Sequence, residues 1–385
     1  MILMWLGSLA LLLFGLVESQ KAIAHAFSSL QKNALEENVE SSNLKLFLKN
    51  AILTFFEASP SKSLYSGMAA YNLRVLSLRS GVLWMCLSTL GAWWILVMGA
   101  MFLNLNGLLF LGLGFFAYVL RGQAVRQYLR ISLFIGLFLL GGELALRNSA
   151  VLLNSLGTGE FVFFMADGRL LSVLGILCLG VVLSFFISVE FWSVCFALCL
   201  LVANIISVNG ALGLFAGERI GRMILFWWRT RSLNQDCRRV GWQLAMVSAS
   251  AAFLGFMIAG LLRGDGGIGF SGEMDLSREK LMEFLSLSFV ILIVQFVAQM
   301  IWGHFGSQMK VDEIQEARYI PKSWLDQELL SVEAVTWIRT KVQKRISEIR
   351  YHRQGLQTVK EGQIPEAIQA RLKAEEEELS RFLQD

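Results

Sequence analysis

The sequence predicts an all-α polytopic membrane protein with two inverted repeats, each carrying a re-entrant or broken helical hairpin, and a short cytoplasmic helical tail. The composition is the first reason, because 55% of the 385 residues are hydrophobic and only 17% are charged. The second is the length of apolar runs such as VLWMCLSTLGAWWILVMGAMFLNL and GWQLAMVSASAAFLGFMIAGLL, since a helix of about 20 such residues crosses a bilayer. The third is a weak internal repeat. Backbone groups in lipid must be hydrogen-bonded internally, so the spans are helices.

The N-terminal stretch MILMWLGSLALLLFGLVESQ is the first expected span. Its apolar character is also that of a signal peptide, but it lacks both a positively charged region and a small-residue cleavage site. We therefore expect a span that is retained.

Two basic clusters set the expected orientation of the spans. RGQAVRQYLR (121–130) and RTRSLNQDCRR (229–239) separate apolar runs, and positively charged loops face the cytoplasm. Counting from them places one hairpin at 46–77 on the cytoplasmic side and another at 170–208 on the opposite side. The other expected spans cover 80–103, 105–120, 130–147, 210–228, 239–262 and 281–304, which leaves the C-terminus in the cytoplasm.

An internal repeat relates the two hairpins. LTFFEAS (53–59) and LSFFISV (183–189) are similar at an offset of 130 residues, and the same offset carries Gly91 onto Gly221. Similar segments with opposite orientation are the mark of an inverted repeat. We expect a first transmembrane repeat at 1–128, a second with the final spans at 129–308, and a helical tail at 309–385.

The segment LTFFEASPSKS (53–63) interrupts the first hairpin with polar residues. Pro60 cannot donate a backbone hydrogen bond, so it favours a helix break. Ser59, Ser61 and Ser63 add short hydroxyl groups around it. In transporters with inverted repeats, broken helices meet near the bilayer midplane and hold the substrate there. Their N-termini offer free N–H groups to an anion.

Six charged residues lie within or beside apolar helices: Glu57, Lys62, Glu190, Glu218, Arg219 and Arg222. Buried charge is costly, so such residues face a cavity, form pairs or bind a ligand. Three interpretations stay open. The arginines bind an anion, or Glu190 pairs with one of them inside the protein, or Lys62, Glu218 and Arg222 reach water at helix ends.

Other residues in the spans indicate packing. Gln295 and Gln299 are one helical turn apart and are expected to bond between helices. The five cysteines and three histidines have no metal-ligand spacing. The sequence contains no nucleophile–base set and no phosphate loop, so we expect no enzyme, no cofactor and no nucleic-acid partner.

The motifs resemble those of the sodium/phosphate cotransporter family, in its bacterial form with a C-terminal PhoU-like helical tail. LALLLFGL and GLFLLGGEL resemble the openings of the family's two repeats, and LTFFEASPSKS and LSFFISVEFWS occupy the places of its two serine-rich motifs. LFAGERIGRM occupies the place of its second LGANIGTT motif. SWLDQELLSVEAVTWIR is similar to the start of the tail. The likeness covers about residues 5 to 345. It departs from the family's motifs at Ala58, Pro60, Ser188, Val189, Glu190, Phe191, Arg219 and Arg222.

The resemblance implies a function and a set of binding residues. It implies sodium-dependent symport of phosphate or a related small anion across the cytoplasmic (inner) membrane by alternating access, with Na⁺ as the coupling ion. The candidate binding residues combine the hydroxyl groups of the two serine-rich segments with the charges in the second one and in LFAGERIGRM. They are Thr54, Ser59, Ser61, Ser63, Ser184, Ser188, Glu190, Arg219 and Arg222. The alternative is a transport-impaired relative with a structural or regulatory role in the membrane. The expected partners are membrane lipids, the anion and Na⁺, and a homo-oligomer stays open.

Overall fold

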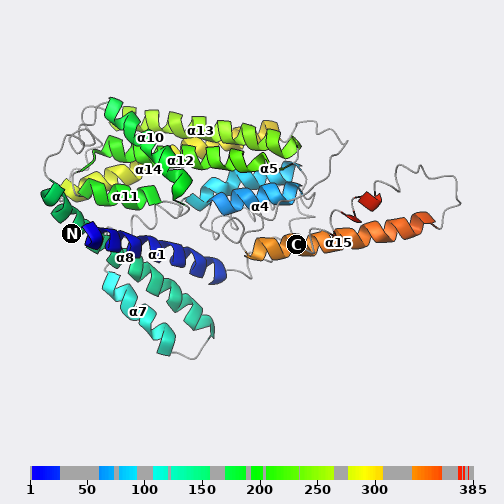
Figure 1. Cartoon of the computed structure of the whole chain (residues 1–385), viewed down its shortest axis with the longest axis horizontal. Helices are drawn as coiled ribbons and strands as arrows, with labels where there is room; N and C mark the ends of the chain where they lie inside the picture. Colours follow the sequence, from blue (N-terminus) through cyan, green and yellow to red (C-terminus); the bar gives the residue numbers. More distant parts are fainter. Residues whose placement is uncertain are drawn as a thin grey trace.

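In the residues that it describes, the computed structural model is almost entirely helical, with short non-helical links at 187, 205–207 and 231–233 (Figure 1). These are residues 2–26, 60–72, 78–92, 107–119, 123–156, 170–187, 192–202, 205–233, 235–263, 276–306, 332–357, 372–374, 376–377 and 380. The helices are α1 (Ile2–Ala26), α4 (Pro60–Asn72), α5 (Leu78–Leu87), the 3-10 helix η2 (Ser88–Ala92), α7 (Gly107–Val119), α8 (Gln123–Leu156), α10 (Leu170–Phe186), α11 (Trp192–Val202), α12 (Val208–Thr230), α13 (Gln235–Arg263), α14 (Leu276–Gly306) and α15 (Val332–Gln357).

Four of the described helices are long and apolar enough to cross a membrane. The membrane-crossing parts are Leu3–Ile23, Tyr128–Ala145, Gln235–Arg263 and Glu279–Phe305. They correspond to the expected first span, to the span at 130–147 and to the last two spans. The chain therefore has the all-α, membrane-spanning character that its composition predicts.

Two expected elements differ in the structure. The basic cluster at 121–130 is not a loop throughout, because α8 begins at Gln123 and continues without a break past residue 128. The expected span at 80–103 begins as α5, which tightens into η2 at Ser88. Residues 93–103 of that span lie outside the described part of the chain.

Helices α1, α7 and α8 pack together through glycines and lie beside the main bundle in Figure 1. A Cβ atom at Gly15 would come within 2.7 Å of the Cα atom of Phe138, and one at Gly141 within 2.7 Å of the Cα atom of Leu12. The contact runs forward along α1 as it runs backward along α8, so the two helices are antiparallel. Small residues let membrane helices approach this closely.

A ladder of glycines joins α10 to α12. Gly213, Gly217 and Gly221 follow at four-residue spacing on α12 and face Val173, Leu177 and Val181 of α10 in turn. Since both sets advance together along the chain, α10 and α12 are parallel. The chain must therefore turn back between them, and α11 is the returning helix.

Helices α4 and α5 on one side and α11 on the other lie toward opposite ends of α12, α13 and α14 (Figure 1). The contacts agree with this view. The aromatic ring of Tyr65 on α4 meets Phe226 near the end of α12, with 5.4 Å between ring centroids. Ser193 on α11 meets Glu218 in the middle of the same helix. Helix α12 is thus the common partner of the two short helical segments.

The described part of the tail contains one long helix. Helix α15 buries Ile338, Val342, Ile346 and Ile349, which recur at helical spacing along one face. Arg350 of this helix forms an ion pair with Glu376, with 2.8 Å between Nε and Oε1. The chain after α15 therefore returns to the side of this helix.

Candidate functional site

The candidate site lies where α10 ends and α11 begins. Helix α10 ends at Phe186, and the backbone N–H of Ile187 closes its last turn by donating to the carbonyl of Leu183 over 2.9 Å. Helix α11 begins at Trp192. Helix α12 packs against both helices and carries Glu218, Arg219 and Arg222 at this level.

The side chain of Arg222 forms a hydrogen bond with the backbone at the C-terminal end of α10. Its Nη2 donates a hydrogen bond of 2.8 Å to the backbone carbonyl of Ile187. The last carbonyl groups of a helix have no partner within the helix and carry partial negative charge, so a guanidinium group is favourable there. Arg222 is buried, with 8% of its side chain exposed.

The side chain of Glu218, on α12, contacts the first turn of α11. Its Oε2 accepts a hydrogen bond from the hydroxyl of Ser193, which lies in the first turn of α11. The other carboxylate oxygen, Oε1, lies 3.7 Å from Nη2 of Arg222, one helical turn further along α12. A helix N-terminus carries partial positive charge, so the carboxylate has the sign that this position favours.

The third charge of the group contacts a neutral amide. Nε of Arg219 lies 3.3 Å from Oε1 of Gln295, on α14. Four residues along α14, Nε2 of Gln299 donates to the hydroxyl of Ser248 on α13 over 2.6 Å. These contacts confirm the expectation that Gln295 and Gln299 bond between helices. Both glutamines are fully buried.

Some polar atoms along α14 have no hydrogen-bond partner within the described part of the chain. They are Oγ of Ser288, Nε2 of Gln295 and Oε1 of Gln299, and their spacing places them on one face of the helix. Buried polar groups are normally bonded to protein, water or a ligand. This face therefore offers both donors and acceptors to a small polar species.

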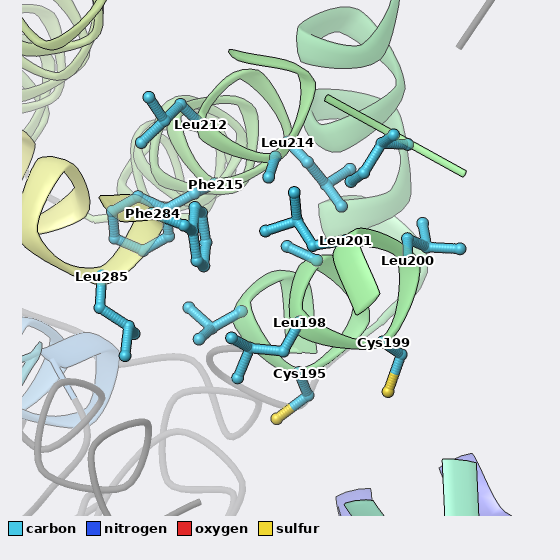
Figure 2. Close-up of a cluster of buried hydrophobic side chains, with 14 of the residues drawn as sticks. Cys195, Leu198, Cys199, Leu200, Leu201, Leu212, Leu214, Phe215, Phe284 and Leu285 are labelled. Atoms are coloured by element: carbon cyan, nitrogen blue, oxygen red, sulfur yellow. The ribbon is translucent and has the colours of Figure 1, made fainter. Parts of the chain in front are cut away.

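The charged group lies beside an apolar core. Figure 2 shows the cluster that α11, α12 and α14 form, with Leu198, Leu201, Leu214, Phe215 and Phe284 among its labelled members. Apolar surroundings strengthen the interactions between charges and raise the cost of leaving a charge unpaired. The contact between Glu218 and Arg222 is therefore expected to contribute strongly to the stability of this region.

The structure brings some of the expected site residues to this place. Arg219 and Arg222 are in the group itself. Ser184, on the last turns of α10, packs against Gly221 and donates its hydroxyl to the carbonyl of Val181 over 2.6 Å. It therefore takes part in the contact between α10 and α12.

Two of the serines expected in the first hairpin, Ser61 and Ser63, lie on α4. The hydroxyl of Ser63 accepts a hydrogen bond of 3.1 Å from Nε1 of Trp84 on α5. Ser61 is half-buried in the first turn of α4, and Pro60 occupies the first position of that helix, which suits its missing N–H. Thr54, Ser59, Ser188 and Glu190 lie outside the described residues.

One of the open interpretations is wrong for two residues. Glu218 and Arg222 were candidates for charges that reach water at helix ends, but only 1% and 8% of their side chains are exposed. The described acidic partner of an arginine here is Glu218, and the pairing predicted for Glu190 lies outside the described residues. Sequence reasoning also missed Ser193. Nothing in the sequence distinguishes it from the other serines in apolar segments, and its role becomes visible only from its contact with Glu218 of α12.

We compared the chain with models of known protein families, with characterised proteins and with solved structures. None of them matches. The resemblance to the sodium/phosphate cotransporters therefore stays a prediction from the motifs.

Proposed function

We propose that the protein is an alternating-access transporter that carries phosphate or a related small anion across the cytoplasmic membrane together with Na⁺. The observation that carries the proposal is the pair of buried arginines on α12, which lie where α10 ends and α11 begins. A buried charge in a membrane protein indicates a functional site. Guanidinium groups bind phosphate with charge-assisted hydrogen bonds.

The described helix ends support an internal repeat. Asn72 and Val202, the last residues of α4 and α11, are 130 positions apart, and so are Leu78 and Val208, the first residues of α5 and α12. The ends of α1 and α8 have the same separation. This is the offset at which the two hairpin sequences are similar, so we infer that the two halves share one arrangement of helices.

The beginning of α11 offers the chemistry that an anion needs. Ser193 supplies a hydroxyl, the first turn of α11 supplies N–H groups, and Arg222 supplies a guanidinium group beside them. Arg219 adds a second positive charge at the next turn of α12. The proposed anion site is therefore formed by α11 and α12.

The equivalent part of the first repeat favours a cation. At the offset of 130, Ser88 and Thr89 of η2 correspond to Glu218 and Arg219. Both are buried, and they offer hydroxyl groups in place of charges. Unwound backbone and oxygen ligands hold Na⁺ in transporters built on inverted repeats. We place the proposed Na⁺ site near η2 and the polar face of α14, which packs against it.

The proposed orientation has support at the end of α4. The thiol of Cys237, in the basic cluster at 229–239, contacts Oδ1 of Asn72 over 3.3 Å. Since α4 runs from Pro60 to Asn72, its last residue lies beside that cluster. With the cluster in the cytoplasm, the first hairpin opens to the cytoplasmic side, and the C-terminal tail follows α14 on that side too.

A second function has an observation of its own. Glu218 accepts a hydrogen bond from Ser193 and pairs with Arg222. These are the groups that an anion would bind, so this arrangement is expected of a site that no longer binds substrate. On this alternative, the protein is a transport-impaired relative with a structural or regulatory role in the membrane.

Uptake of radiolabelled phosphate into proteoliposomes, with and without a sodium gradient, tests the proposal. We expect sodium-dependent uptake by the natural protein and its loss in Arg219→Gln. Arg147→Gln is the matched control, because Arg147 is an exposed arginine paired to Glu143 on α8. No uptake of phosphate or of sulfate by the natural protein would favour the structural or regulatory role.

A further inference from the structure

We infer that the Glu218 carboxylate is a built-in occupant of the anion site, and that an external anion binds only after Glu218 leaves it and takes up a proton. This inference rests on the proposed function, because it describes the regulation of the same site. On this inference, the transport cycle involves a proton in addition to the anion and Na⁺.

The two carboxylate oxygens of Glu218 have different partners. One carboxylate oxygen accepts from Ser193 at the N-terminus of α11, and the other lies 3.7 Å from the guanidinium group of Arg222. A hydroxyl, a helix N-terminus and a guanidinium group are also what a phosphate or sulfate ion would bind. The side chain and an external anion therefore compete for one set of donors.

Charge makes this competition exclusive. Two negative charges within a few ångströms in an apolar region repel strongly. A carboxylate that loses its guanidinium partner while buried is also strongly destabilised. Protonation removes both costs, because a neutral carboxyl group needs only hydrogen bonds. Binding of the anion is thus coupled to uptake of one proton from water by Glu218.

Few other groups near Glu218 can take up that proton. Among the described residues, α12 contributes Arg219 and Arg222, which keep their charge at all ordinary pH values. Helix α11 contributes Cys195, a buried free thiol. Helix α10 offers Arg222 the carbonyl of Ile187, and α14 offers Arg219 the neutral Gln295. Within the part of the chain that the structure describes, Glu218 is therefore the acidic member of this group.

A binding experiment on the full-length protein in detergent tests the inference. Sulfate is the probe, because its charge does not change between about pH 5.5 and 8, and binding is measured by the rise in the midpoint of thermal unfolding. We expect the natural protein to bind sulfate more tightly as the pH falls, by up to about tenfold per pH unit. Glu218→Gln should bind sulfate tightly at every pH, because its amide is always neutral.

Two further variants make the test specific. Ser193→Ala removes one hydrogen bond to the carboxylate and leaves Glu218 and both arginines in place. Its sulfate binding should therefore still depend on pH, and this variant serves as the test if Glu218→Gln does not fold. Glu143→Gln is the control, since Glu143 forms the exposed pair with Arg147 at the same i,i+4 spacing as Glu218 and Arg222. It should bind sulfate as the natural protein does.

The outcomes separate this inference from the proposed function. Sulfate binding and phosphate uptake that are independent of pH, and equal in the natural protein and in Glu218→Gln, would overturn the inference and leave the transport proposal standing. Absence of anion binding and uptake in both proteins would overturn both.

Discussion

Gly217 of α12 packs directly on the backbone carbonyl of Leu177 of α10. A Cβ atom at position 217 would overlap that carbonyl oxygen, and it would also lie 3.1 Å from the Cα atom of Gly180. This contact lies in the middle of the glycine ladder and sets the distance between the two parallel helices, which both reach the candidate site.

The first prediction concerns this contact. Gly217→Ala should destabilise the protein by about 1–3 kcal/mol, because the methyl group can be accommodated only if one backbone moves. Gly260→Ala on α13 is the control, since nothing lies within 4 Å of a Cβ atom there. Alanine is the better helix former, so the control should be neutral or slightly stabilised. Thermal unfolding in detergent would compare them, and equal stability would contradict close packing at Gly217.

The second prediction concerns the buried ion pair. Arg222→Gln should cost about 3–5 kcal/mol of unfolding free energy, because it removes the guanidinium group that lies 3.7 Å from the buried Glu218 carboxylate. Arg147→Gln breaks a pair of the same spacing that is largely exposed, so it should cost no more than about 1 kcal/mol. A denaturant titration of both variants would measure the difference. If the two costs were equal and small, water would have to reach Glu218.

The third prediction concerns the contact between α13 and α14. Gln299 and Ser248 are both buried and share a hydrogen bond of 2.6 Å. The single variants Gln299→Leu and Ser248→Ala should each destabilise the protein, and the double variant should cost less than their sum. We expect a coupling energy of about 0.5–2 kcal/mol from a double-mutant cycle in detergent. Strict additivity would show that the bond contributes nothing to stability.

The fourth prediction concerns orientation in the membrane. Val125 and Gln235 are exposed at the beginnings of α8 and α13, and Leu262 is exposed near the end of α13. Introduced cysteines at 125 and 235 should react with an impermeant reagent from the cytoplasmic side, and a cysteine at 262 from the opposite side. Labelling of 125 and 235 from opposite sides would exclude the inverted repeat.

The long spans could be predicted from sequence because composition alone decides them. Helices α1, α13 and α14 follow apolar runs whose burial in lipid outweighs any local preference. The start of α8 was predicted less well, since the basic residues at 121–130 indicate a cytoplasmic position but do not end a helix. A charge pattern reports topology, whereas helix ends depend on local backbone contacts.

The candidate site could be predicted only in part. The arginines stood out because charges in an apolar helix are rare. Their partners did not, since Ser193 is 25 residues and Gln295 is 76 residues away from the group that each contacts. The sequence predicted Glu190, which lies outside the described residues, as an acidic partner, and the described pair uses Glu218. The contact of Glu218 with Ser193 depends on how α11 and α12 pack, and no local pattern encodes that.

The parallel packing of α10 and α12 has a consequence for biogenesis. Helix α11 has 11 residues, which corresponds to about 16 Å and is too short to cross the hydrocarbon region alone. It returns the chain between two helices that share the glycine ladder, and its first turn is bonded to α12 through Ser193. During synthesis, α11 emerges before its partner on α12 exists. Its final position therefore depends on a helix that is made later, and variants that weaken the ladder should leave α11 exposed to quality-control proteases even when every long span has been inserted.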